Sequence, residues 1–128
     1  MTLKILIAGK DKSLFHTVKD VFEDEDAHII VATSIGLALF LTRKNQPEVI
    51  IAQEELADSD GLSFYYELQN EDELANIPFI LLVEDISRLQ AAKHNMSKDN
   101  LHFVSRQEVQ SANVNRLKEK IMAYLDSP

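Results

Sequence analysis

The side chains of this sequence that could do chemistry include carboxylates, hydroxyls and four histidines. The chain contains no cysteine, so thiols are not among them. The lack of thiols excludes a disulfide framework, a thiolate nucleophile and a cysteine-based metal site. The histidines are His16, His28, His94 and His102. They fall on different expected elements without a ligand spacing such as HExxH, and so they predict no metal site. The segment AGKDKS (8–13) has one glycine and matches no phosphate-binding loop.

Carboxylates are the commonest of these side chains, and several follow apolar runs. Asp11 comes after the first run, and Glu54 and Glu55 come after the third. A carboxylate can ligate Mg²⁺ or act as a nucleophile. Side chains alternate along a strand, however, so Glu54 should point away from its predecessor. We interpret Asp58 and Asp60 as turn and capping residues of the following helix. The acidic runs are interpreted as solvated surface: EDED (23–26) and EDE (71–73).

Apolar runs that alternate with amphipathic segments must position these residues. Short runs rich in Ile, Leu and Val are typical of buried strands. Five such runs are expected as strands: 3–8, 28–32, 49–52, 79–83 and 101–104. Segments with an apolar stripe and capping signals predict helices. These are a helix capped by Ser13 that runs to Phe22, a helix capped by Thr33 or Ser34 that runs through Leu41 and ends before Pro47, and helices over 61–69, 86–95 and 108–125.

Strands that are apolar on both faces indicate a parallel sheet covered by helices on both sides. Right-handed crossovers then favour an α/β fold, a (βα)5 doubly wound, flavodoxin-like three-layer sandwich with strand order 2-1-3-4-5. The length fits a single domain over 1–128. Sites in this architecture lie at the carboxyl ends of the strands, here after Ala8, Ala52, Val83 and Val104.

The whole chain resembles the receiver domains of two-component response regulators. LKILIAGKDKSL (3–14) resembles the receiver opening, in which an apolar strand runs into paired acidic residues. QPEVIIAQEELADSDGLSF (46–64) resembles the stretch from the third strand to the third helix, with Pro47 near its start and Asp60 and Gly61 near its end. The other matching segments are ATSIGLAL (32–39) and IPFILLV (77–83). The resemblance implies a bacterial signal-transduction protein of the phosphorelay type.

Receiver chemistry, as the resemblance implies it, needs five side chains. Two acids hold Mg²⁺, an Asp accepts the phosphoryl group, and a hydroxyl and a Lys contact the phosphoryl oxygens. All five matching positions depart from that pattern. They hold Gly9 and Lys10 for the acid pair, Gln53 for the phosphoacceptor, Val83 for the hydroxyl and Ser105 for the Lys. A neutral amide cannot form an acyl phosphate, so we expect no catalytic residue, no metal, no cofactor and no enzymatic activity.

Two further positions differ from the family, and one residue carries a hypothesis of its own. His102 stands where an aromatic residue commonly couples to the switch, and Arg106 stands where the family usually has Pro. The ammonium of Lys10 could take the place of the missing metal and bond to Gln53 or Glu55, which would fix one switch conformation. The alternative is a solvated lysine on a loop.

The net charge of −8 is unevenly distributed. Residues 1–83 hold 6 Lys and Arg against 15 Asp and Glu, a net −9, whereas residues 84–128 hold 7 against 6, a net +1. An acidic chain disfavours nucleic acid as a partner. The first apolar run is too short for a signal peptide or a membrane span. Together with the absence of cysteine, this leads us to expect a cytoplasmic protein without a membrane partner.

The near-neutral last third is the expected partner face. Receivers usually contact partners through the fourth helix, the fifth strand and the fifth helix, and these elements fall within residues 84–128. We expect this face to bind a protein, either an acidic partner or a second copy of the chain. Its candidate contacts are Arg88, Lys93, Lys98, Arg106, Arg116 and Lys120.

The sequence therefore predicts a phosphorylation-independent pseudo-receiver that acts through protein–protein interaction. Two alternatives stay open. One is a phosphorylatable response regulator with atypical site chemistry, in which a carboxylate near residue 53 accepts the phosphoryl group. The other is a flavodoxin-like binder of a small molecule such as a flavin or a nucleotide, against which the lack of a phosphate-cradling loop counts.

Overall fold

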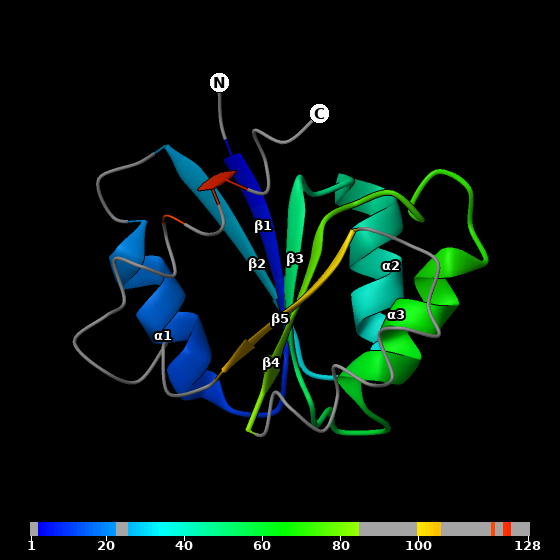
Figure 1. Cartoon of the computed structure of the whole chain (residues 1–128), viewed down its shortest axis with the longest axis horizontal. Coiled ribbons are helices and arrows are strands. Elements are labelled where there is room, and N and C mark those ends of the chain that lie inside the picture. The colour runs from blue at the N-terminus through cyan, green and yellow to red at the C-terminus, as the bar shows by residue number, and fades with distance from the viewer. Residues whose placement is uncertain (1–2, 23–25, 85–99, 106–118, 120–121, 124–128) are drawn as a thin grey trace.

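A five-stranded parallel sheet forms the centre of the molecule (Figure 1). The computed structural model describes residues 3–22, 26–84, 100–105, 119 and 122–123. Its strands are β1 (Leu3–Ala8), β2 (Ala27–Ala32), β3 (Val49–Gln53), β4 (Phe79–Val83) and β5 (Leu101–Ser105). Its helices are α1 (Lys12–Val21), α2 (Ile35–Asn45) and α3 (Gly61–Gln69). The strand order β2-β1-β3-β4-β5 confirms the predicted doubly wound, flavodoxin-like arrangement.

The helices lie in two layers on opposite faces of the sheet. Figure 1 shows α1 on one side and α2 and α3 together on the other. Of the helix expected over 108–125, only residues 119, 122 and 123 are described, and these are helical. The helix expected over 86–95 lies outside the described residues. Within the described part of the chain, no helix is both long and apolar enough to cross a membrane.

Each face of the sheet contributes to a separate apolar core. On one face, Val18 of α1 and Phe22, the residue that caps the C-terminus of α1, pack against the sheet. On the other face, Phe64 and Leu68 of α3 are fully or almost fully buried. Burial of a large apolar side chain stabilises a fold by about 1.5–3 kcal/mol. These cores explain why most strand positions are apolar, as in other parallel sheets, with exceptions such as Lys4 of β1 and His28 of β2.

The helix caps agree only in part with the prediction. Ser34 caps α2 and Asp60 caps α3, as expected. The expectation that Ser13 caps the first helix is wrong, because the carboxylate of Asp11 accepts the backbone N–H of Ser13 at 2.9 Å. Asp58 does not serve α3 either, because its carboxylate accepts the N–H of Ile35 at the start of α2, at 2.8 Å.

Asn100 joins the start of β5 to the connection between α3 and β4. Its amide nitrogen donates to the carbonyls of Ala75 at 2.9 Å and Ile77 at 2.8 Å. Its amide oxygen accepts from the Tyr65 hydroxyl at 3.4 Å. The Tyr65 ring also packs edge-on against Phe79, with 5.2 Å between the ring centroids. Burial of the Tyr65 hydroxyl raises its pKa, and the charge of nearby Tyr66 raises this pKa further. One side chain thus bonds to three polar groups, two in the connection between α3 and β4 and one in α3.

We expect Asn100→Ala to lower the free energy of unfolding by about 1–3 kcal/mol. The Ile77 carbonyl would lose its side-chain donor, the Tyr65 hydroxyl would lose its acceptor, and the Ala75 carbonyl would keep only the Gln69 amide as a side-chain donor. Urea unfolding followed by circular dichroism measures this change. Asn70→Ala is the matched control, since Asn70 is exposed, and it should change the free energy by less than about 0.5 kcal/mol. Equal losses in the two variants would contradict the role given to Asn100.

Candidate functional site

The carboxyl ends of the strands form the candidate site. Strand pairing sets Ala8 opposite Ala52, Gln53 opposite Leu82, and Val83 opposite Ser105. The five positions singled out from the sequence therefore lie on, or next to, the ends of β1, β3, β4 and β5. A cavity of about 330 Å³ lies at this edge. Its lining residues are Lys10, Asp11, Gln53, Glu54, Glu55 and Glu84.

Gln53 is the central residue of the site and is only 6% exposed. Its amide oxygen accepts the backbone N–H of Asp11 at 2.9 Å. Its amide nitrogen donates to the backbone carbonyl of Asp11 at 3.3 Å. One neutral side chain thereby ties the end of β3 to the connection between β1 and α1. Both ends of the amide have a partner, as a buried polar group requires.

Gly9 provides the space in which the Gln53 side chain lies. A Cβ atom at residue 9 would stand 2.5 Å from the Gln53 Cδ and 2.7 Å from its Cγ, and it would overlap the amide oxygen. Among the described glycines none has a positive φ, so the requirement at residue 9 is space and not backbone conformation. Gly9 and Gln53 are therefore complementary in shape.

Gly61 allows a second close approach at the same end of β3. A Cβ there would overlap the Gln53 carbonyl oxygen and stand 2.7 Å from Leu81 Cδ1. The Gly61 N–H donates to the Glu54 carbonyl at 3.0 Å. This contact explains the glycine in the Asp60–Gly61 pair that the sequence resemblance picked out.

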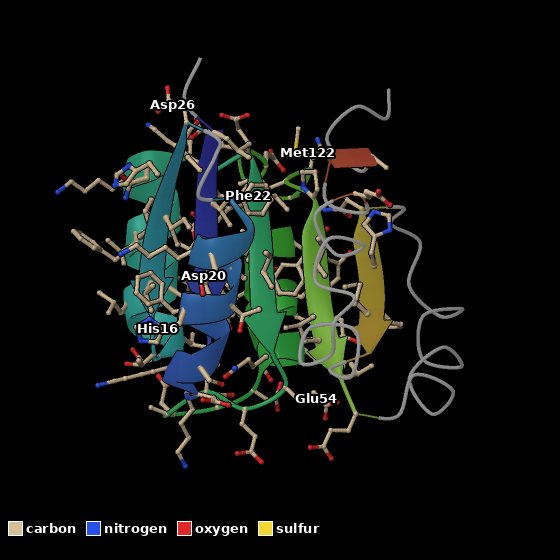
Figure 2. All side chains as sticks on the ribbon, turned by 90° about the vertical axis from the view of Figure 1, so that its left-hand side faces the viewer. His16, Asp20, Phe22, Asp26, Glu54 and Met122 are labelled. Atoms are coloured by element: carbon tan, nitrogen blue, oxygen red, sulfur yellow. The ribbon has the colours of Figure 1, made fainter. Side chains whose placement is uncertain are left out.

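Glu54 forms a hydrogen bond on the other side of β3, the side of β4. Its carboxylate accepts the backbone N–H of Glu84 at 2.8 Å, so it holds the segment that follows β4. Figure 2 labels Glu54 at the carboxyl edge of the sheet. Gln53 bonds to the connection after β1 and Glu54 bonds to the segment after β4, so the two consecutive side chains point away from each other.

The hypothesis for Lys10 is wrong. The Lys10 side chain is exposed, and within the described residues its ammonium forms no ion pair or hydrogen bond with Gln53 or Glu55. The amide oxygen of Gln53 already accepts from the Asp11 backbone. The backbone N–H of Lys10 donates to the Glu55 carbonyl at 3.3 Å.

The remaining predicted residues are placed unequally. Val83 is fully buried and offers no hydroxyl. Ser105 ends β5, and His102 lies within β5, partly buried and opposite Ile80. The candidate partner contacts lie outside the described residues: Arg88, Lys93, Lys98, Arg106, Arg116 and Lys120. The site prediction missed two bonds, those of Gln53 to Asp11 and of Glu54 to Glu84. The only sequence signal for the first was a glycine directly after β1 combined with a long amide side chain at the end of β3.

A divalent cation, which the receiver resemblance implies, does not fit this donor set. Mg²⁺ requires several oxygen ligands in a near-octahedral arrangement. The acid pair is replaced by a glycine without a side chain and by a cationic lysine, and the only oxygen of the Gln53 side chain already accepts a backbone N–H. Among the described residues, no three acidic, histidine or cysteine side chains are grouped so that they could hold a metal ion.

We expect Gly9→Ala to lower the free energy of unfolding by about 1–3 kcal/mol, because the new methyl would displace Gln53 and break both bonds to Asp11. Most of that loss should vanish when Gln53→Ala removes the obstructing side chain, and a double-mutant cycle from urea unfolding measures the coupling. Gly36→Ala is the matched control. A Cβ at Gly36 of α2 meets nothing within 4 Å, so this change should stabilise the protein by up to about 1 kcal/mol. Additive losses at residues 9 and 53 would contradict the proposed fit.

Comparisons with solved structures show which known proteins share this architecture. A putative response regulator from Chloroflexus aurantiacus J-10-fl is 19% identical, with a TM-score of 0.80, and the match covers 99% of this chain and 100% of that one. The chemotaxis response regulator CheY4 of Vibrio cholerae is 16% identical, with a TM-score of 0.79 and coverage of 97% and 99%. The receiver domain of the Francisella response regulator 1452 is 22% identical, with a TM-score of 0.78 and coverage of 96% of each chain.

Protein-family models and curated protein sequences give no match to this chain. The likeness thus resides in the arrangement of strands and helices, at sequence identities of 16–22% across these three structures. The chain has the fold of response-regulator receiver domains.

Proposed function

We propose that this chain is a receiver-type signalling protein whose output does not depend on phosphorylation and which acts by binding other proteins. The observation that carries the proposal is the double hydrogen bond between the Gln53 amide and the Asp11 backbone. A side chain held in this way is neither a nucleophile nor a metal ligand. The proposed role is that of a non-catalytic module.

The chemistry of the site supports this proposal at each remaining position. An acyl phosphate requires a carboxylate, and the nearest carboxylates are engaged elsewhere or displaced from residue 53. Asp11 caps α1, and Glu54 accepts from the Glu84 backbone. Glu55 is exposed at the end of the strand. No hydroxyl is available at the end of β4, where Val83 is buried.

The partner surface proposed for this function is the near-neutral last third of the chain. Residues 84–128 carry a net +1 in a protein of net −8, so an acidic protein would meet less repulsion there than elsewhere. The proposed contacts are Arg88, Lys93, Lys98, Arg106, Arg116 and Lys120. The two strands at the edges of the sheet are β2 and β5, and this proposal uses the β5 side.

We expect Mg²⁺ and beryllofluoride, a mimic of the phosphoryl group, to leave the backbone amide NMR signals of residues 9–11, 53, 83 and 105 unchanged. The physical reason is that the site offers neither the oxygen ligands nor the acceptor carboxylate that these ions need. A small-molecule phosphoryl donor should likewise add no mass to the intact protein.

The control for this experiment is the double variant Lys10→Asp, Gln53→Asp, which keeps the glycine and creates three neighbouring carboxylates with Asp11. It should gain Mg²⁺-dependent shifts in the same region. Saturable shifts in the unmodified protein would remove the proposal and favour a regulator with atypical phosphorylation chemistry.

A further inference from the structure

The outer edge of β2 is open. Within the described residues, β2 pairs on one side only, with β1. The carbonyl of Asp26 accepts the N–H of Leu3 at 2.8 Å, and the carbonyl of Ala32 accepts the N–H of Gly9 at 3.0 Å. Residues in a strand direct their backbone groups alternately to the two sides. The N–H and C=O groups of the odd-numbered residues, Ala27, Ile29 and Val31, therefore face the open edge.

This edge lacks the features by which proteins prevent strands from pairing with other chains. Exposed edges are usually protected by charged side chains, by proline or by a bulge. β2 has the sequence AHIIVA, without a charge or a proline, and its register with β1 is regular over all six residues. Carboxylates, which are frequent elsewhere in this acidic chain, could also have kept other strands from this edge, but residues 27–47 contain no Asp or Glu.

An apolar helix face lies beside the same edge. α2 exposes Leu37 to 44% and Phe40 to 56%, although its opposite face is already buried against the sheet. A surface helix is normally polar on its outer side, and one that is apolar all round is normally covered. Figure 2 shows α2 next to β2 at one edge of the sheet, with β5 at the other edge. Partly buried Ile30 and Leu41 lie in the same layer and pack against the core there.

We propose that this edge binds a second copy of the chain, with β2 antiparallel to its symmetry mate and α2 packed near the α2 of the partner. A two-fold axis perpendicular to the sheet makes one continuous sheet and keeps both α2 helices on one side of it. Strands pair at about 4.8 Å and helices pack at about 8–10 Å. The exposed residues of α2 are therefore able to cover one another when the strands pair.

The helices are needed to complete this interface. A stable interface buries about 800 Å² on each partner, and a pair of six-residue strands contributes mainly backbone hydrogen bonds. The outer side chains of α2 add apolar area to the contact between the strands. Leu37 and Phe40 are, with Tyr66 of α3, the large apolar side chains with high exposure in the described part of the chain.

Charge favours a second copy as the occupant. Two molecules of net −8 repel each other wherever their carboxylates meet. Over residues 27–47 the only charges are those of Arg43 and Lys44. Arg43 is already paired with Glu71 at 2.8 Å, and the Lys44 ammonium lies 5.9 Å from the centre of the Phe40 ring. An uncharged strand edge is complementary to itself, whereas it offers an acidic partner few cations to bind.

The first measurement is sedimentation of the full chain over a concentration series. We expect the mass to rise toward twice 14.5 kDa. Phe40→Glu should abolish this association at concentrations where the unmodified protein is dimeric, because it places two carboxylates beside the two-fold axis. His28→Glu, at an exposed position of β2, should do the same from the strand side. Tyr66→Glu is the matched control, because Tyr66 is 50% exposed on α3 and the strand that α3 contacts most is β4, which β1 and β3 separate from β2. This change should leave the dimer intact.

Amide hydrogen exchange followed by NMR gives the second measurement. The N–H groups of Ala27, Ile29 and Val31 have no acceptor within the described part of one copy, so they should exchange rapidly in the monomer and slowly in the dimer. Circular dichroism of each variant establishes that it is folded. A protein that stays monomeric at its highest soluble concentration would overturn the proposal. A dimer in which other amides, and not those of Ala27, Ile29 and Val31, are protected from exchange would overturn it as well. So would a dimer that Tyr66→Glu disrupts as strongly as Phe40→Glu does.

Discussion

The pairing of the Gln53 amide with the Asp11 backbone is the interaction on which the site depends. Each hydrogen bond of this kind adds only about 0.5–1.5 kcal/mol of net stability, but a buried partner left unsatisfied costs about 1–3 kcal/mol. A carboxylate in the same place would face the Asp11 carbonyl without a proton to donate, and it would need a cation beside it. The neutral amide, which can both donate and accept, satisfies the same backbone without any ion. The space for it exists because residue 9 has no side chain.

This junction bears on how a protein of the proposed kind is regulated. A switch responds to a ligand only if the ligand binds one of two conformations more tightly than the other. The Gln53 amide already has both of its hydrogen-bond partners within the chain, so phosphate and metal ions would find little reason to bind one conformation of this site more tightly than another. The connection after β1 is held by Gln53, and the segment after β4 is held by Glu54. Under the proposed function, the response therefore depends on which protein is bound and at what concentration, and not on a covalent modification at residue 53.

Much of the architecture could be predicted from the sequence, because buried parallel strands are apolar at most positions and their order follows from right-handed crossovers. The errors arose where a long-range contact decides between two local signals. Asp11 and Ser13 are both good capping residues, and the bonds of Gln53 to the Asp11 backbone place Asp11 at the cap. Asp58 precedes α3 in sequence, but its carboxylate accepts the N–H of Ile35 at the start of α2, 23 residues away. Lys10 could not be placed from the sequence, because that required knowing how the Gln53 amide is oriented.

The stretch 27–47, which contains no Asp or Glu, can be interpreted only once its place in the fold is known. In the sequence it is one strand and one helix that happen to lack carboxylates. In the fold, β2 ends the sheet and α2 covers β2 and β1, so both elements contribute to one side of the molecule. The core fully accounts for the inner residues of α2, such as Ala38 and Leu39, but it does not account for Phe40 on the outer side. Under the proposed dimer, this apolar side chain and the strand edge without protecting charges are explained together, because the second copy covers both.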